Sequence, residues 1–193
     1  MVLGKAFLAL SANELERLYH TNVLAHYHTI QQLLPTMLKR QHGGTIVTIS
    51  SVLGYTGCAG LSAYTSSKAA LTAMHHSLTA ELTFLAQQKT AQVGALSSES
   101  AGSVKTLLVT PGQLSTPLFK DVTPPSTFLG PVVQVNELAA EIVKRIDAGE
   151  GGELSMPLYA RWIGLLGLLP AGMGSTTRRL AGLDTAGWQA FGK

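Results

Sequence analysis

The chain has 193 residues, of which 46% are hydrophobic and 13% are charged, and its net charge is +3. This length is typical of one domain, and the apolar content excludes a disordered protein. The Lys and Arg residues are scattered without a long basic run, so no nucleic-acid partner is expected. Cys58 is the single cysteine, which excludes an internal disulfide.

Residues 12–40 are predicted to form a long helix. Ser11 and Glu14 have the spacing of a capping box, in which each side chain bonds to the backbone of the other residue. Apolar residues then recur near helical spacing. We expect the helix to bend near Asn22 or Pro35, because sharp bends occur at prolines and where the hydrogen-bond ladder is interrupted.

The run "TIVTISS", 45–51, is rich in β-branched residues and carries no charge. It is typical of a central strand in a parallel sheet that is covered by helices on both faces. A second helix is expected over about 63–88. The polar, Gly- and Ser-rich stretch 87–103 then predicts a flexible surface insertion.

"VKTLLVT", 104–110, predicts a second buried strand that Pro111 and Gly112 end. Four prolines in 113–135 predict a loop, which is a candidate lid. A helix follows, with Asn136 expected as its N-cap and Gly149 as its stop. "ELSMP", 153–157, is the third predicted strand, and an apolar segment and a tail follow it.

This order of helices and strands predicts an α/β fold with a parallel sheet. The sequence supplies only three strands, and two of them have the composition of strands that are covered on both faces. A sheet this small leaves strand edges open. We therefore expect part of a larger doubly wound sheet in residues 1–157, followed by an apolar C-terminal segment in 158–193.

Tyr64 and Lys68 are four residues apart on the second helix, so they share one face. An ammonium about 4 Å from a phenol favours the phenolate by about 4 kcal/mol at an effective dielectric near 20, although burial opposes this effect. Such a pair can donate and accept a proton near neutral pH. Taken alone, this spacing is also common by chance.

Ser51 lies directly after the first strand, thirteen residues before Tyr64. Ligands of doubly wound sheets bind outside the carboxyl ends of the strands. A hydroxyl at that place, close to the next helix, can reach the same substrate oxygen as Tyr64. The position of Ser51 therefore favours a catalytic role for the Tyr64–Lys68 pair over a chance spacing.

Three stretches resemble the short-chain dehydrogenase/reductase family, and together they cover roughly residues 4–160. They are "TNVLAHYHTIQQLLPTMLKRQHGG", "GGTIVTISSVLGYTGCAGLSAYTSSKAALTAMHHSLTAEL" and "LLVTPGQLSTPL". The resemblance implies a Rossmann-like sheet that here lacks its N-terminal strands. It also implies NAD or NADP as the cofactor.

The resemblance assigns catalytic roles to four residues. Tyr64 would exchange a proton with the substrate, and Ser51 would steady the substrate oxygen. Lys68 would lower the Tyr64 pKa and bond to the nicotinamide ribose, and Asn22 would hold a water that connects Lys68 to solvent. Further cofactor contacts are expected from Tyr64 itself and from Pro111, Gly112 and Thr116. No residue is assigned to a metal.

The family's Gly-rich cofactor loop, T-G-x-x-x-G-x-G, and its N-N-A-G stretch do not occur in this sequence. "GYTGCAG", 54–60, has a different glycine spacing and suits a loop on the substrate side. Two explanations stay open. The chain is either a truncated form of an ordinary dehydrogenase or a short form with impaired cofactor binding.

The C-terminal part resembles the retinol dehydrogenase and 17-beta-hydroxysteroid dehydrogenase branch, which implies a small lipophilic substrate. The resemblance also implies a location on the endoplasmic reticulum, at its cytoplasmic face, or on lipid droplets, with the cytoplasm as the alternative. "WIGLLGLLPAGM", 162–173, is too short to span a bilayer but can lie in its surface. Packing of this segment on the core is the alternative. A non-catalytic protein derived from the family is the second hypothesis for function.

The histidines do not have the spacing of a metal site, and they are expected on helix surfaces or interfaces. His26 and His28 cannot share a helix face, and His75 is adjacent to His76. The helix at 63–88 carries Ala and Leu on more than one face, so a homodimer through this helix is one expectation. A fully buried core helix is the other.

Overall fold

The computed structural model describes residues 1–87, 92–93, 96–97, 103–116, 131–168 and 182–191, together with Met173, Thr176 and Arg179. Its main sheet has three parallel strands in the order β1-β4-β5, with Ile49 opposite Val109 and Pro111 opposite Met156. A short antiparallel pair, β2 and β3, lies within the predicted insertion. The strands are β1 (Gly44–Ile49), β2 (Gln92–Val93), β3 (Leu96–Ser97), β4 (Val104–Pro111) and β5 (Gly152–Met156). The predicted α/β fold with a parallel sheet is confirmed.

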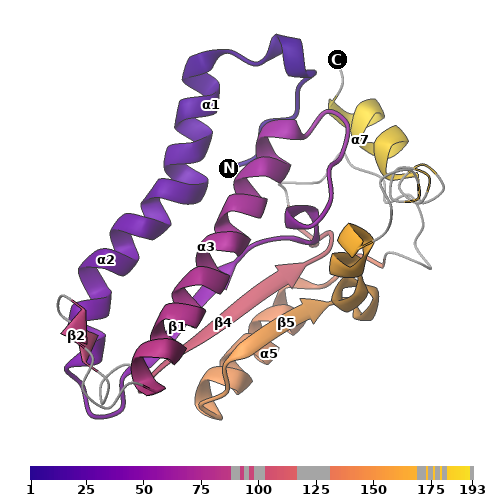
Figure 1. Cartoon of the computed structure of the whole chain (residues 1–193). Helices are drawn as coiled ribbons and strands as arrows, with labels where there is room; N and C mark the ends of the chain where they lie inside the picture. The colour runs from indigo at the N-terminus through magenta and orange to yellow at the C-terminus, as the bar shows by residue number, and fades with distance from the viewer. Residues whose placement is uncertain are drawn as a thin grey trace.

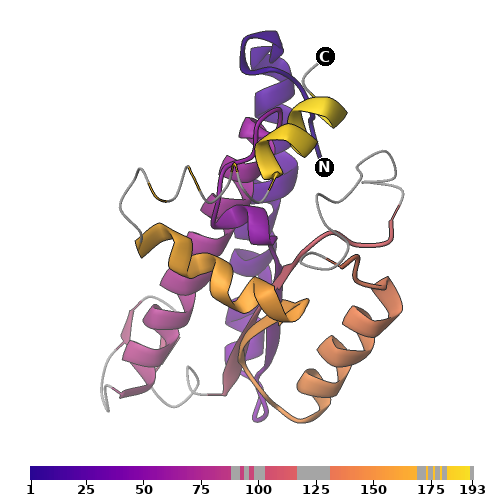
Figure 2. The same ribbon diagram turned by 90° about the vertical axis from the view of Figure 1, so that its right-hand side faces the viewer.

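Helices cover the sheet on both faces, with α2 and α3 on one side and α5 on the other (Figures 1 and 2). The α-helices are α1 (Ala12–Tyr19), α2 (Ala25–Leu38), α3 (Ser62–Gln87), α5 (Val135–Asp147) and α7 (Leu183–Phe191). The remaining helical segments are η1 (Phe7–Ala9), η2 (His20–Leu24), η3 (Val52–Gly54) and η5 (Leu158–Leu168).

The first long helix begins and bends where the sequence predicts. Both halves of the Ser11–Glu14 capping box are present. Between α1 and α2 the chain forms one π-helical segment, η2, which contains Asn22. Such π-bulges interrupt the regular hydrogen-bond ladder and redirect a helix. Pro35 lies inside α2.

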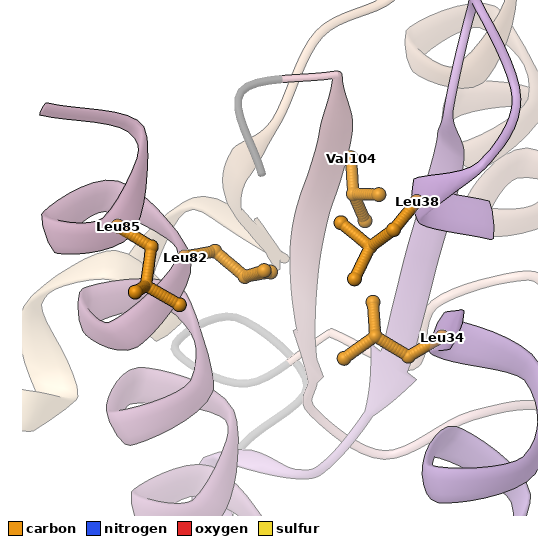
Figure 3. Close-up of a cluster of buried hydrophobic side chains, with 5 residues drawn as sticks. All are labelled: Leu34, Leu38, Leu82, Leu85 and Val104. Carbon is orange, nitrogen blue, oxygen red and sulfur yellow. The ribbon is translucent and has the colours of Figure 1, made fainter. Parts of the chain in front are cut away.

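Two apolar clusters hold the layers together. Leu34 and Leu38 of α2 meet Leu82 and Leu85 of α3 above Val104 of β4. Figure 3 shows these five side chains pointing toward one another between the two helices and the sheet. On the other face, β4 and β5 pack against α5 through Leu107, Val109, Val133, Leu138 and Leu154. Burial of each such side chain contributes about 1.5–3 kcal/mol.

β1 does not lie at the centre of the sheet, so this part of the prediction is wrong for the described chain. Its neighbour is β4 on one side, and no described strand pairs with its other edge. Of its six residues only Thr48 is buried, and Ile49 is 46% exposed. β4 is central instead, and seven of its eight residues are buried.

The ends of α5 differ from prediction at one position. The N-cap is Gln134, and Asn136 lies inside the helix, so the predicted cap is wrong by two residues. Gly149 follows the C-cap Ala148 with a φ of 66°, a conformation that glycine adopts without strain. Most of the predicted lid lies outside the described residues, but its ends meet in a bridge between Leu114 and Val133.

β5 ends at Met156 and η5 begins at Leu158, while the proposed division of the chain at residue 157 stays a prediction. η5 contacts β5 and η3. It also exposes large apolar side chains: Leu158, Trp162 and Leu165. In the part of the chain that the structure describes, no helix is both long and apolar enough to cross a membrane.

Candidate active site

The predicted site residues gather at the carboxyl ends of β1 and β4. Ser50 N–H donates to the Val109 carbonyl at 2.8 Å, which continues the pairing past the last residue of β1. Ser51 and Pro111 therefore lie at the same edge of the sheet. This is the edge at which parallel α/β sheets bind ligands.

Ser51 and Tyr64 meet at this edge. The Ser51 Oγ accepts a hydrogen bond from Leu53 N–H at 3.1 Å, which orients it at the start of η3. A side-chain hydrogen bond also joins Ser51 to Tyr64. Burial raises the pKa of Tyr64, and the Ser51 hydrogen bond only partly opposes this rise. The two hydroxyls therefore lie together at this edge of the sheet.

Lys68 lies beside the phenol, as the four-residue spacing predicts. Its Nζ is 5.9 Å from the centre of the Tyr64 ring and donates to the Ile49 carbonyl at 2.9 Å. Burial lowers the pKa of Lys68 to about 8. Lys68 is still mostly an ammonium at neutral pH. In this structure burial outweighs any effect of that charge on Tyr64, because the net shift of the Tyr64 pKa is upward.

Asn22 belongs to the same neighbourhood through α3. Its Nδ2 donates to the Met1 carbonyl at 2.9 Å and to Ser67 Oγ at 3.0 Å, and its Oδ1 accepts from the Met1 ammonium at 2.9 Å. Ser67 precedes Lys68, so Asn22 is anchored one residue from the lysine. Its predicted role as the holder of a water for Lys68 stays a prediction.

The cofactor-side residues follow β4. Gly112 N–H donates to the Met156 carbonyl at 2.7 Å. A Cβ at Gly112 would lie 2.8 Å from the Tyr159 hydroxyl, so a larger residue there would displace the end of this tyrosine side chain. Thr116 Oγ1 is buried and has no hydrogen-bond partner among the described residues. A buried hydroxyl without a partner is costly unless a ligand or water satisfies it.

Sequence reasoning missed the residues that tie β1 to α3. Ser50 Oγ donates to the Lys68 carbonyl at 3.0 Å and shares a 2.7 Å hydrogen bond with Thr72. Gly54 lies close to the same turn of α3, because a Cβ there would be 3.0 Å from the Lys68 carbonyl. For Ser50 the only signal in the sequence was its position directly before Ser51, at the end of the predicted strand.

His75 is not on the surface, contrary to expectation. It is 2% exposed, and its Nδ1 shares a 2.8 Å hydrogen bond with Thr48 Oγ1 of β1. His76 is exposed and lies 3.0 Å from Glu153. Across the described ranges, no group of three or more His, Cys, Asp or Glu side chains is arranged to hold a metal ion.

The short chain dehydrogenase family model matches residues 2–126. The chain therefore belongs to the short-chain dehydrogenase family. The relatives described below place it in the branch that contains 17-beta-hydroxysteroid dehydrogenases, as the sequence predicts.

Relatives of known sequence are longer than this chain. The uncharacterized oxidoreductase TDA5 of Saccharomyces cerevisiae is 33% identical over 178 residues, which are 92% of this chain and 50% of that protein. Estradiol 17-beta-dehydrogenase 11 of Mus musculus is 34% identical over 133 residues, 69% of this chain and 39% of that protein. The chain thus spans about half the length, or less, of these relatives.

A solved structure supports the fold. The short-chain dehydrogenase of Sphingobium yanoikuyae, in complex with NADPH, superposes with a TM-score of 0.65 at 26% identity. The match covers 92% of this chain and 61% of that one. The three parallel strands described here thus correspond to part of a longer Rossmann-type fold.

Proposed function

We propose that this oxidoreductase uses NAD or NADP to interconvert an alcohol and a ketone or aldehyde on a small lipophilic substrate. One observation carries the proposal: the hydrogen-bonded hydroxyls of Ser51 and Tyr64 lie at the carboxyl edge of the sheet, next to the Lys68 ammonium. Two hydroxyls and a cation are what a substrate oxygen needs when it gains or loses a proton.

The residues present fit the nicotinamide half of the cofactor. Thr116 Oγ1 is buried and has no hydrogen-bond partner in the described part of the chain. Lys68 Nζ donates to a backbone carbonyl that a ribose hydroxyl can replace. We assign these two residues, with Tyr64, Pro111 and Gly112, to that half. The bound cofactor supplies or accepts the hydride. The adenine half is proposed to be held by residues outside this chain.

Tyr64 is the proposed proton donor in the reducing direction and the acceptor in the oxidising direction. Its raised pKa keeps the phenol protonated at neutral pH in the free protein. Ser51 would donate to the substrate oxygen as negative charge develops there, because its Oγ is already oriented by Leu53 N–H. Lys68 would stabilise the phenolate after the proton has left.

The proposal of a lipophilic substrate is supported by a relative and by an exposed apolar segment. The name of the relative estradiol 17-beta-dehydrogenase 11 refers to a steroid substrate, which supports a sterol-like or other lipophilic alcohol as the substrate of this chain. Trp162 of η5 is 64% exposed and Leu158 and Leu165 are also exposed, which supports contact of η5 with a membrane surface. Residence on the endoplasmic reticulum or on lipid droplets follows from this contact as a proposal, and the cytoplasm is the alternative.

Two further expectations stay proposals. A homodimer through α3 is supported by Phe84, which is 60% exposed on that helix. The second candidate function is a non-catalytic protein derived from the same family. The observation that favours it is that the family's Gly-rich cofactor loop does not occur within these 193 residues.

Replacement of the phenol by Tyr64→Phe tests the function. The reduction of NAD or NADP by a medium-chain secondary alcohol and by estradiol is followed by absorbance. We expect kcat to fall at least about 100-fold, because a general acid–base contributes about 10²–10⁴. Tyr19→Phe is the matched control, because the Tyr19 hydroxyl bonds to Ser66 on an exposed surface and leaves the site unchanged.

If Tyr64→Phe retains full turnover, Tyr64 is not the proton donor and the mechanism fails. If the unaltered chain does not bind millimolar cofactor, measured by thermal shift, the non-catalytic alternative is favoured.

A further inference from the structure

The first turn of η5 directs a phenol back toward the candidate active site. Tyr159 is half-buried and follows β5, whose last residue, Met156, pairs with Pro111. Its hydroxyl lies against the α-carbon of Gly112, because a Cβ there would be 2.8 Å from it. Gly112 follows β4 at the same edge of the sheet as Ser51. The hydroxyl therefore lies at the end of the sheet where we place the substrate.

The Tyr159 hydroxyl is a hydrogen-bond donor that the described chain does not use. Burial raises the pKa of Tyr159, so the phenol keeps its proton at neutral pH. No other residue in the described ranges forms a hydrogen bond with this hydroxyl. Such a half-buried phenol costs free energy unless water or a ligand bonds to it.

η5 connects the end of β5 to the loop that follows Ser51. It contacts both β5 and η3, and η3 begins directly after Ser51. Farther along η5, a Cβ at Gly164 would lie 3.7 Å from Cδ1 of Tyr55, the residue after η3. The single charged residue of η5, Arg161, is exposed. Sites for lipophilic ligands use a few placed polar groups to fix orientation, and Tyr159 is such a group.

The Tyr159 hydroxyl is within reach of a ligand that is held at Ser51. Ser51 and Gly112 follow neighbouring strands, which are about 4.8 Å apart. The hydroxyl is therefore one to two strand spacings, or about 5–10 Å, from Ser51. A small molecule that places one oxygen between Ser51 and Tyr64 can thus place a second oxygen at Tyr159.

We propose that Tyr159 determines substrate specificity by donating a hydrogen bond to a second oxygen of the substrate, about 5–10 Å from the reacting oxygen. The substrate class is then a lipophilic alcohol or ketone with a second hydroxyl or carbonyl group, rather than a simple fatty alcohol. The position of the reacting oxygen rests on the proposed function. The second bond holds the ligand along the sheet edge and fixes the orientation of the reacting carbon.

Two alcohols that differ at one position test the proposal. Octane-1,7-diol and 2-nonanol share a secondary alcohol, and a methyl group in 2-nonanol replaces the primary hydroxyl of the diol. Dissociation constants for the full chain with NADP are measured by ligand-observed NMR, and kcat/KM by absorbance. Tyr159→Phe removes the hydroxyl and keeps the ring. It should weaken binding of the diol by about 2–12-fold relative to 2-nonanol, the contribution of one neutral hydrogen bond.

Tyr19→Phe is the matched control, because it removes a hydroxyl that bonds to Ser66 on an exposed surface. It should leave the ratio of the two dissociation constants unchanged. The proposal is overturned if Tyr159→Phe weakens both alcohols equally, because the phenol would then only pack against the ligand. It is also overturned if neither alcohol binds, or if the variant weakens binding of NADP and leaves the ratio unchanged.

Tyr64→Phe separates this proposal from the proposed function. That variant should lose turnover, while the effect of Tyr159→Phe on the ratio of dissociation constants should persist in its background. A chain that shows this effect without any turnover would contradict the proposed function and support the role of Tyr159. Turnover of both alcohols with a ratio that Tyr159→Phe does not change would contradict the role of Tyr159 alone.

Discussion

β1 and β4 have similar sequences and very different surroundings. β1 has no charged residue, and β4 has only Lys105. Nevertheless seven of eight β4 residues are buried, and only one of six in β1. β4 has a strand on each side and helices on both faces, whereas β1 pairs with β4 alone among the described strands. Composition thus shows that both strands suit a sheet interior, and only their neighbours determine which one occupies it.

The difference matters for the candidate site, because Ser51 lies two residues after the end of β1. Its anchors are polar: Thr48 bonds to His75, and Ser50 bonds to Thr72 and to the Lys68 carbonyl. β4 is held mainly by apolar contacts on both faces. The two strands should therefore respond differently to loss of apolar volume and to pH.

The largest difference is expected from matched truncations. Leu107→Ala in β4 removes a fully buried side chain and should lower the free energy of unfolding by about 2–5 kcal/mol. Val47→Ala in β1 removes a partly buried side chain and should cost about 1 kcal/mol. Denaturant titration measures both values. Equal costs would show that β1 is as enclosed as β4 and would contradict the comparison.

The stability contributed by the hydrogen bond between His75 of α3 and Thr48 of β1 should depend on pH. Burial lowers the pKa of His75 from 6.5 to about 4, so the folded state binds its proton less well than the unfolded state. Stability is then complete above about pH 6.5 and falls as the pH decreases toward 4, by up to about 3 kcal/mol. Thermal unfolding across this range measures the loss.

His75→Gln should abolish most of this pH dependence, because no imidazole remains to be protonated beside Thr48. His76→Gln is the matched control: it removes the adjacent exposed histidine and should retain the slope. A wild-type stability that is flat between pH 6.5 and 4 would rule out a buried neutral His75.

The smallest change in stability is expected from the loss of a side-chain hydrogen bond between β4 and α3. Thr106 and Thr79 share a 2.8 Å hydrogen bond between β4 and α3. Thr106→Val should cost only about 1 kcal/mol, because Thr79 Oγ1 still donates to the His75 carbonyl at 2.9 Å. Denaturant titration checks this. A cost as large as that of Leu107→Ala would mean that β4 also depends on polar contacts.

Local signals in the sequence predicted most of the elements. The capping box at Ser11, the bend at Asn22, the stop at Gly149 and all three strands of the main sheet were found in this way. The cap at Asn136 was wrong, because the cap is Gln134 and the helix begins at Val135, two residues earlier than a cap at Asn136 requires. The side-chain types of a cap and of the first helical turn overlap, so neighbouring residues decide such boundaries.

The candidate site was predicted in part. The spacing of Tyr64 and Lys68 placed them on one face, and the position of Ser51 after a strand placed it near both. Ser67, Ser50 and Tyr159 could not be found in this way, because each acts through a contact with a residue far along the chain.

The sequence by itself determined the three strands of the main sheet and most of the longer helices, because periodicity and capping act over a few neighbouring residues. It also determined that Tyr64 and Lys68 share a helix face. Only the tertiary structure decided that β1 lies at the edge of the described sheet and that His75 is buried against Thr48. It also decided that the pKa of Tyr64 rises. Burial and strand order arise from the packing of segments distant in sequence, and no local pattern specifies that packing.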